Sequence, residues 1–348
     1  MKEGYKHKEN IIFELIFQIW IEERIPLSWV EALICPIHKK RDVQNCEKFR
    51  GISLVNIAYK LLSIVLYRRL KPHANQIIGQ YQCGFREGVS TTDQIQTLRQ
   101  ILEKTLEFEI ETHHLFIDFK TAYDKVNRNR LYKAILEFGI PPKLVRLIQA
   151  TMEGTTAKVK MQNELSGSFH ILNGLRQGDT LDCILFNIAL EKVKRDANIN
   201  QRGNIFYKSV QILAYADDID IISRSPKSLQ EATIALDRAA RRMGLEINQA
   251  KTKYMICGTK KKHVENIFKV KYMTFERVNS FVYLEKLITT DNNTSAEINN
   301  RITLANRSYF GLVNILKAKN INRKYLKICQ VSKYLCHFPL YDEIPEAR

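Results

Sequence analysis

The chain is 348 residues long and 45% of its residues are hydrophobic, so it can bury a core and is too apolar for a disordered polymer. Lysine and arginine total 54 against 37 aspartate and glutamate residues, which leaves a net charge of +17. Such a charge attracts polyanions, although a basic surface that is merely solvated has the same composition. The seven cysteines lack CxxC spacing, which argues against a zinc site or a disulfide framework and favours a reducing compartment.

An apolar stretch near the N-terminus, residues 11–21, is too short to span a bilayer and is interrupted by Glu14 and Gln18. It also lacks the small-residue cleavage site of a signal peptide. Phe13, Phe17, Trp20 and Ile21 recur at helical spacing. This spacing predicts one face of a helix that ends near Pro26.

Helical and strand-like segments alternate through the rest of the chain without an internal repeat or a long linker, which predicts one compact α/β body. The elements predicted in the first third are a strand over 32–37, a helix over 57–70 that Pro72 stops, and a helix over 95–106 that Thr92 or Asp93 caps. Those predicted in the middle third are strands over 114–118, 155–161 and 169–172 and helices over 129–138 and 181–195. Those predicted in the last third are helices over 228–243 and 295–318, strands over 254–257, 269–275 and 280–288, and a helix from 323 onward.

Between the helices over 181–195 and 228–243, two apolar runs over 211–215 and 219–223 have the spacing of a β-hairpin. Asp217 and Asp218 lie at its predicted tip, and Asp118 ends another apolar strand. Carboxylates in such surroundings are unfavourable unless they are paired or bind a cation. Three converging carboxylates suit Mg²⁺, whereas an isolated Asp-Asp pair is more often plain turn chemistry and a lone Asp118 could cap a helix.

The order of these motifs resembles that of reverse transcriptases. Residues 116–124 (FIDFKTAYD) are similar to the first palm motif, and residues 215–218 (YADD) are similar to the YxDD motif. Residues 174–179 (GLRQGD) and 244–248 (GLEIN) with Lys251 resemble the intervening and following motifs, while 49–54 (FRGISL), 82–86 (QCGFR) and 90–93 (STTD) resemble fingers segments of non-long-terminal-repeat, LINE-type retrotransposon enzymes. One YADD is a weak signal, but six ordered motifs over about 25–308 are a strong one.

The resemblance implies a mixed α/β (α+β) right-hand polymerase fold with fingers, an antiparallel-sheet palm and a shortened helical thumb. We expect fingers over 1–110, the palm over 111–288 with an inserted fingers segment near 125–172, and a partial thumb over 289–348. It also implies two Mg²⁺ ions, for which Mn²⁺ could substitute, held by the side chains of Asp118, Asp217 and Asp218 and by the carbonyl of Phe119.

Further roles follow from the resemblance. Tyr123 would lie beneath the sugar and exclude a 2′-hydroxyl, although a plain core aromatic is the alternative. The expected nucleotide-binding residues are Gln177, Gly178, Lys39, Arg50 and Lys251. The expected nucleic-acid contacts are Arg176, Arg86, Tyr283 and Leu284. For Lys39 and Arg176, a solvated surface charge is the competing interpretation.

Several positions depart from the family pattern, and one of them is Gly51, where many relatives have proline. Asp182 is expected to add negative charge near the nucleic acid, Val89 stands where arginine is usual, and Glu285 replaces a glycine in a tight turn. No endonuclease segment is recognised, and these features indicate a truncated or degenerate copy of a mobile element.

The leading hypothesis is an RNA-directed DNA polymerase acting on an RNA template, a DNA primer and deoxynucleoside triphosphates, with no membrane association. The alternatives are a catalytically inactive remnant that binds RNA or RNA–DNA duplex, and an RNA-dependent RNA polymerase, which Tyr123 argues against. The family places such a protein inside the cell, in the nucleus or the cytoplasm.

Overall fold

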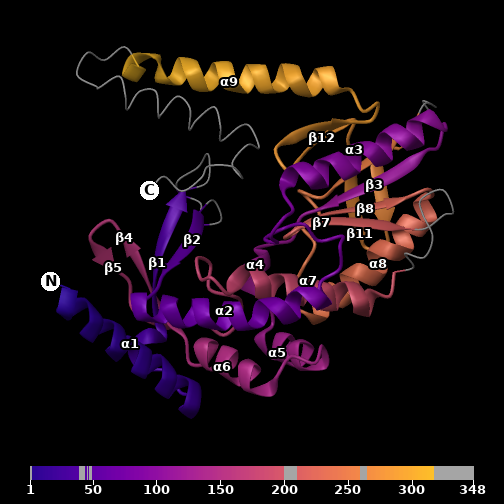
Figure 1. Ribbon diagram of the computed structural model, residues 1–348. Helices are drawn as coiled ribbons and strands as arrows, with labels where there is room; N and C mark the ends of the chain where they lie inside the picture. The colour runs from indigo at the N-terminus through magenta and orange to yellow at the C-terminus, as the bar shows by residue number, and fades with distance from the viewer. Residues whose placement is uncertain are drawn as a thin grey trace. The chain divides into compact units, whose positions relative to one another are not determined.

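The structure is a computed structural model that describes residues 2–38, 44, 46, 49–199, 210–258 and 265–316 (Figure 1). The chain divides into two compact units, each assembled from separate stretches of sequence. The first unit comprises Met1–Phe85, Asp118–Asn200 and Glu231–Asn248. The second comprises Arg86–Ile117, Gln201–Gln230 and Gln249–Arg348.

The first unit contains a small mixed sheet of strands in the order β2-β1-β4-β5, with β6 also paired to β4. Its strands are β1 (Glu31–His38), β2 (Phe49–Leu54), β4 (Thr156–Met161), β5 (Glu164–Leu165) and β6 (Phe169–His170). β1 pairs antiparallel with β2 and parallel with β4, where Leu33 lies opposite Lys158. The parallel pair therefore joins two segments that are far apart in the sequence.

Helices provide most of the core of the first unit. They are α1 (Lys2–Glu22), the short 3-10 helix η1 (Leu27–Trp29), α2 (Ile57–Ile77), α4 (Ala122–Lys125), α5 (Arg128–Glu137), α6 (Pro142–Met152), α7 (Asp182–Ala197) and most of α8 (Pro226–Arg242). α2 packs on α6 and α7, and α5 packs on the same two helices (Figure 1). α7 is central because its apolar residues are buried on every side: Leu185, Phe186, Ile188, Leu190 and Val193.

The second unit is built on a six-stranded sheet in the order β10-β11-β9-β3-β8-β7. Its strands are β3 (Thr112–Ile117), β7 (Gln211–Tyr215), β8 (Asp218–Ser223), β9 (Lys253–Cys257), β10 (Ile267–Val270) and β11 (Met273–Arg277). Neighbours are antiparallel except β9 and β11, which run parallel. Every residue of β3 is buried, as expected of a strand in the middle of a covered sheet.

One face of this sheet is covered by α3 (Thr91–Glu107), as Figure 1 shows. Leu98 and Leu102 of α3 belong to a buried cluster with Phe116 and Leu213 of the sheet. The hairpin formed by β12 (Ser280–Tyr283) and β13 (Lys286–Thr289) adds Tyr283 to the same cluster. The described chain ends in α9 (Thr294–Leu316).

Most predicted elements are present, with corrections to two strands and two helix ends. The strands predicted over 269–275 and 280–288 are each a hairpin of two strands, β10 with β11 and β12 with β13, because a turn interrupts each apolar run. α2 does not stop at Pro72 but continues to Ile77. Leu70 and Ala74, on either side of the proline, are completely buried, so packing outweighs the loss of about 3 kcal/mol that proline causes inside a helix. The helix predicted from 323 onward lies outside the described residues.

The N-terminus of α3 is capped by Ser90, not by Thr92 or Asp93. The Ser90 hydroxyl accepts a hydrogen bond from the Asp93 N–H at 3.4 Å, and the Asp93 carboxylate accepts one from the Ser90 N–H at 2.7 Å. This reciprocal pair is a capping box. The hydrogen bonds that the Asp93 carboxylate accepts, from the Ser90 hydroxyl and then from the Ser90 N–H, hold the pKa of Asp93 below its usual range.

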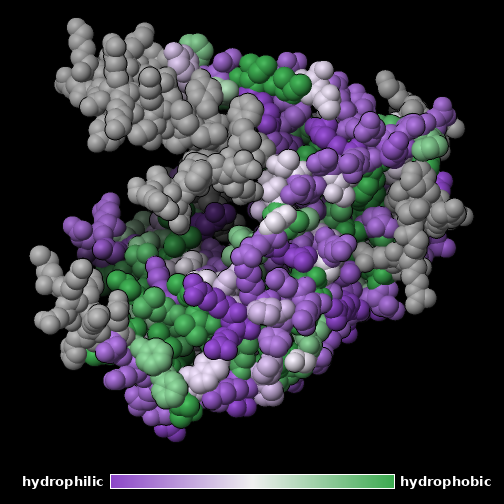
Figure 2. All heavy atoms as spheres, viewed as in Figure 1, coloured by the Kyte–Doolittle hydropathy of each residue, from purple (hydrophilic) through white to green (hydrophobic). Residues whose placement is uncertain are grey.

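The α1 helix exposes much of the apolar face that the sequence predicts. Phe13 is 70% exposed and Phe17 is 57% exposed, and their rings stack at 6.3 Å. Figure 2 shows hydrophobic side chains gathered over this helix. The Ile19 side chain of this helix, in contrast, is buried. No helix in the described stretches is long and apolar enough to cross a membrane.

Candidate active site

A carboxylate-bearing hairpin in the second unit is formed by β7 and β8. Tyr215 pairs with Asp218, so Ala216 and Asp217 form a two-residue turn, and Ala216 has a φ of 54°. A positive φ at a non-glycine residue is strained, and such strain is concentrated at functional sites. Asp217 is partly exposed and Asp218 is exposed, while the strand residues behind them are buried.

The register of β3 and β8 relates this hairpin to the strand that ends before Asp118. Ile117 pairs with Ile219 within the second unit. In the chain, Asp118 directly follows Ile117 and Asp218 directly precedes Ile219. The pairing therefore joins, within the second unit, the last residue of β3 to the second residue of β8. In the first unit, the backbone carbonyl of Asp118 accepts a hydrogen bond from the Asn248 N–H at 2.8 Å.

A buried histidine–aspartate pair lies deeper in the same sheet. His114 Nδ1 is 3.0 Å from Asp220 Oδ2, and both side chains are completely buried. Burial lowers the pKa of His114, but the Asp220 carboxylate and Cys257 oppose it and the pKa rises to about 10. The imidazole is therefore protonated at neutral pH and compensates the Asp220 charge. This pairing gives Asp220 a role different from that of the exposed aspartates at the hairpin tip.

The predicted nucleotide-binding residues of the first unit are held by two segments that hydrogen-bond to one another. The Leu175 N–H donates to the Tyr123 carbonyl at 2.8 Å, and Gln177 Nε2 donates to Asp124 Oδ1 at 3.1 Å. The Tyr123 ring stacks on Phe186 of α7 at 4.5 Å. Tyr123 and Gln177 are thus both ordered, and Tyr123 has a packing partner whether or not it contacts a sugar.

Gly178 lies beside β2 at a position that favours glycine. Its φ is +98°, and a Cβ there would approach the Ser53 carbonyl oxygen to 3.3 Å. The neighbouring Gln177 carbonyl accepts a hydrogen bond from the Ser53 N–H at 2.9 Å. The segment predicted to line the nucleotide pocket is therefore attached to the strand that carries Arg50, whose side chain is exposed.

Arg176 has surroundings different from those expected of a nucleic-acid contact. It is 4% exposed, its guanidinium lies over the Tyr59 ring at 4.9 Å, and it donates to the carbonyls of Trp29 at 3.1 Å and Val30 at 2.8 Å. Tyr59 in turn donates to Asp179 at 2.5 Å. These contacts join the N-terminal segment to α2 and to the loop before α7, which is a structural role.

The other predicted residues are distributed as follows. Arg86 is partly exposed and Lys251 is exposed, both in the second unit. Tyr283 is buried at 2% exposure, whereas Leu284 is partly exposed in the turn that follows. Lys39 lies outside the described residues.

Two departures from the family pattern have clear structural settings. Asp182 does not project toward a ligand but is 8% exposed and accepts a hydrogen bond from the Gly178 N–H at 3.0 Å. Burial raises its pKa above the usual range. Glu285 has a φ of 62° and Leu284 a φ of 46°, so both residues of this turn adopt the left-handed conformation that glycine prefers.

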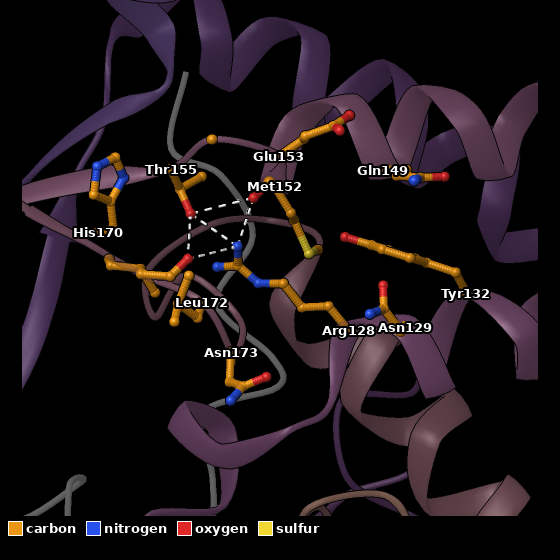
Figure 3. Close-up of a pocket in the computed structure, with 12 residues that line it drawn as sticks. Arg128, Asn129, Tyr132, Gln149, Met152, Glu153, Thr155, His170, Leu172 and Asn173 are labelled. Carbon is orange, nitrogen blue, oxygen red and sulfur yellow. Dashed lines mark hydrogen bonds between the residues drawn. The ribbon is translucent and has the colours of Figure 1, made fainter.

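Arg128 is a residue that the sequence did not single out. It is the first residue of α5, it is 7% exposed, and its guanidinium donates to three backbone carbonyls and one hydroxyl. Figure 3 shows the bonds to the Met152 carbonyl and the Thr155 hydroxyl among them. Its acceptors lie in segments 24 to 46 residues away. The only local signal was an arginine between the first palm motif and a helix, which is not distinctive.

Comparison with solved structures identifies the class of fold. Two structures of telomerase from Candida tropicalis superpose on 80% of this chain with TM-scores of 0.54 and 0.56, at 16% and 13% identity. The superposed regions cover 59% and 52% of those chains. The predicted right-hand polymerase fold is therefore confirmed.

Comparison of sequences then identifies the family. Residues 37–289 match the family described as reverse transcriptase (RNA-dependent DNA polymerase), and the chain belongs to that family. The protein is 24% identical over 251 residues to the probable RNA-directed DNA polymerase from transposon BS of Drosophila melanogaster, and 23% identical over 240 residues to the transposon TX1 uncharacterized 149 kDa protein of Xenopus laevis. The matched regions cover 70% and 68% of this chain but only 27% and 18% of those proteins. The predicted resemblance to non-long-terminal-repeat retrotransposon enzymes is confirmed.

Membership of this family implies the use of a divalent cation. Within the stretches that the structure describes, no three His, Cys, Asp or Glu side chains are arranged as a metal site. The chemistry of the hairpin tip nevertheless fits a hard cation, because Asp217 and Asp218 are adjacent, at least partly exposed carboxylates. Asp118 directly follows β3, the strand that pairs with β8.

Proposed function

We propose that this chain is an RNA-directed DNA polymerase domain that adds deoxynucleotides to the 3′-hydroxyl of a DNA primer. The observation that carries the proposal is the two-residue turn between β7 and β8, which presents Asp217 and Asp218 in a chain of the reverse transcriptase family. The pairing of Ile117 with Ile219 further supports a shared role for Asp118.

We assign the metal-binding role to the side chains of Asp118, Asp217 and Asp218 and to the carbonyl of Phe119. The donors are all oxygen, which suits two Mg²⁺ ions and equally Mn²⁺. When bound, a pair of such ions activates the attacking oxygen and stabilises the leaving oxygen in a phosphoryl displacement. The protein's own contribution is to hold the carboxylates on ordered strand ends before substrate arrives.

We assign nucleotide binding to Tyr123, Gln177 and Gly178 and to the basic residues Arg50, Lys39 and Lys251. Tyr123 would select deoxynucleotides by excluding a 2′-hydroxyl, and the basic residues would hold the triphosphate and the departing pyrophosphate. The exposed Arg50 guanidinium suits bidentate contact with phosphate. Gly178, at a φ of +98°, leaves room for close approach of the backbone.

We assign contact with the RNA template and DNA primer to Arg86 and Leu284. Arg176 and Tyr283 are left out of this set because both side chains are buried, the Arg176 guanidinium against backbone carbonyls and the Tyr283 hydroxyl against the Asp218 carbonyl. The division into fingers over 1–110, palm over 111–288 and thumb over 289–348 is part of the proposal, as is action in the nucleus or the cytoplasm.

Primer extension on an RNA template with Mg²⁺ and deoxynucleotides tests the proposal. Wild type should extend the primer, and Asp217→Asn should lower the rate by at least about a hundredfold because a carboxylate ligand is lost. Asp291→Asn, which changes an exposed aspartate in the same unit, should retain the wild-type rate. Equal extension by wild type and Asp217→Asn would refute the assignment of the site. Repeating the assay with Mn²⁺ distinguishes the two cations.

A second candidate is an inactive remnant that holds RNA or RNA–DNA duplex. The positive φ angles at Leu284 and Glu285 favour it, because the turn between β12 and β13 contains two residues unsuited to its backbone. A folded wild type that binds duplex in a fluorescence anisotropy titration but never extends a primer would support this function over the first. Incorporation of ribonucleotides in the same assay would instead indicate an RNA-synthesising enzyme.

A further inference from the structure

A buried arginine outside the proposed site joins three separate segments of the first unit. Arg128 forms part of the wall of a pocket of about 200 Å³, together with Tyr132, Met152 and Thr155 (Figure 3). The side chain is 7% exposed, and the hydrogen bonds that it donates within the described part of the chain go to neutral acceptors.

The four acceptors come from the last residue of α6 (Met152), the residue before β4 (Thr155) and the loop that follows β6 (Ile171 and Gly174). Arg128 Nε donates to the Gly174 carbonyl at 2.8 Å, while Nη1 donates to the Thr155 hydroxyl at 2.8 Å and to the carbonyls of Ile171 at 3.0 Å and Met152. Hydrogen bonds from a charged donor are about twice as strong as neutral ones, so this arrangement fixes the acceptors firmly. Burial lowers the pKa of Arg128, which the guanidinium tolerates without losing its charge.

Gly174 is the acceptor that leads to the nucleotide motif. Its own N–H donates to the Val126 carbonyl at 2.8 Å, and the next N–H, of Leu175, donates to the Tyr123 carbonyl at the same distance. Gln177 then reaches Asp124. Several hydrogen bonds thus join the segments 123–128 and 174–177. Arg128 adds a bond at the Gly174 end of the second segment, next to Ile171.

We propose that Arg128 is a positioning residue that sets the backbone of 174–178, and through it Gln177 and Gly178, for an incoming deoxynucleotide. The effect on deoxynucleotide binding rests on the proposed function. The ordering of the 174–178 backbone by Arg128 does not. Only a planar guanidinium donates from Nε and Nη1 in fixed directions at once, so lysine should not replace it. Thr155 assists, because its hydroxyl also donates to the Ile171 carbonyl at 3.0 Å.

Hydrogen–deuterium exchange of the full chain without ligands tests the structural part. In Arg128→Gln, the amides of 174–177 should exchange at least about tenfold faster, because a charge-assisted bond to Gly174 is lost. The matched control is Arg130→Gln, an exposed arginine two residues along the same helix, which should leave these amides unchanged. Exchange in β3 and β8 should be unaffected in both variants.

Equal protection of 174–177 in Arg128→Gln and wild type would overturn the inference. If Arg128→Gln does not fold, Thr155→Val provides the same comparison with only one acceptor removed.

Steady-state extension tests the consequence. Arg128→Gln and Arg128→Lys should raise the KM for deoxynucleotide by about tenfold to a hundredfold, with a smaller change in kcat, since a misplaced pocket wall weakens binding in the ground state and the transition state alike. A merely structural role would lower kcat in proportion to the folded fraction and leave KM unchanged, which would overturn the positioning role. A wild type without any extension would refute the proposed function, whereas the exchange experiment would still decide whether Arg128 orders 174–177.

Discussion

The Tyr283 hydroxyl donates a hydrogen bond to the backbone carbonyl of Asp218 over 3.3 Å. The same hydroxyl accepts a hydrogen bond from Gln94 Nε2 of α3 at 3.4 Å. The Tyr283 ring is buried and lies 5.4 Å from the Phe116 ring. A helix and a separate hairpin within the second unit therefore support the backbone at the tip of the carboxylate hairpin. This contact gives the buried Tyr283 a function that needs no direct contact with nucleic acid.

Replacing Tyr283 by phenylalanine should weaken this support without disturbing the core. The ring packing is retained, so we expect a loss of about 1 kcal/mol in the free energy of unfolding, typical of one hydrogen bond. The rate of primer extension should fall by about tenfold because the Asp218 backbone is less well fixed. Urea denaturation and single-turnover extension measure the two effects.

The control Tyr309→Phe, at an exposed position of α9, should change neither the free energy of unfolding nor the extension rate. A normal extension rate in a destabilised Tyr283→Phe would show that the hairpin tip does not depend on this bond.

Gly174 should tolerate no side chain. Its φ is +84°, and a Cβ would lie 2.5 Å from the Asp124 carbonyl oxygen, which is backbone and cannot move aside easily. Gly174→Ala should therefore lower the free energy of unfolding by about 2 kcal/mol or more. Gly167→Ala is the matched control, since Gly167 has no atom within 4 Å of its added Cβ, and it should change stability by less than about 0.5 kcal/mol. Similar urea midpoints for the two variants would contradict the close approach of these segments.

Local patterns allowed the carboxylate hairpin to be predicted from the sequence. The apolar runs over 211–215 and 219–223 flank a short polar turn, and β7 and β8 pair with Asp217 at the turn and Asp218 at its end. Hairpin spacing depends only on neighbouring residues, so the sequence contains it directly. The assignment of these aspartates to metal stays a prediction.

Long-range contacts could not be predicted in the same way. Arg176 and Arg128 resemble any other surface arginine in the sequence, yet both are buried by backbone carbonyls distant in the chain. Pro72 marks a helix end by local rules, but tertiary packing of Leu70 and Ala74 carries α2 past it. In each case the deciding interaction lies in another segment, and its energy exceeds the local preference.

The turn between β12 and β13 should be improved by glycine. Leu284 and Glu285 both have positive φ, and a left-handed conformation costs a non-glycine residue about 1–2 kcal/mol. Glu285→Gly should therefore raise the free energy of unfolding by about 0.5–1 kcal/mol, after allowance for the greater entropy of glycine in the unfolded chain. Glu285→Ala removes the same charge but keeps the Cβ, so it separates backbone relief from electrostatics. An equal gain in both variants would assign the effect to the charge and contradict backbone strain.

The buried carboxylate of Asp182 should make stability depend on pH. Burial raises its pKa above the model-peptide value of 3.8, so between these two pKa values the folded protein binds a proton that the unfolded chain has released. The free energy of unfolding contributed by this group therefore falls as pH rises through that window. Asp182→Asn keeps an oxygen for the Gly178 N–H but cannot ionise, so its stability relative to wild type should increase as pH rises above 3.8, the pKa of the carboxyl in the unfolded chain. The control Asp291→Asn should behave in the opposite sense, because the Thr289 hydroxyl lowers the pKa of the exposed Asp291 and the stability from that group is lost as pH falls. Urea denaturation across this range measures both differences. Parallel stability profiles for wild type and Asp182→Asn would mean that the Asp182 carboxylate is as well solvated in the folded protein as in the unfolded chain.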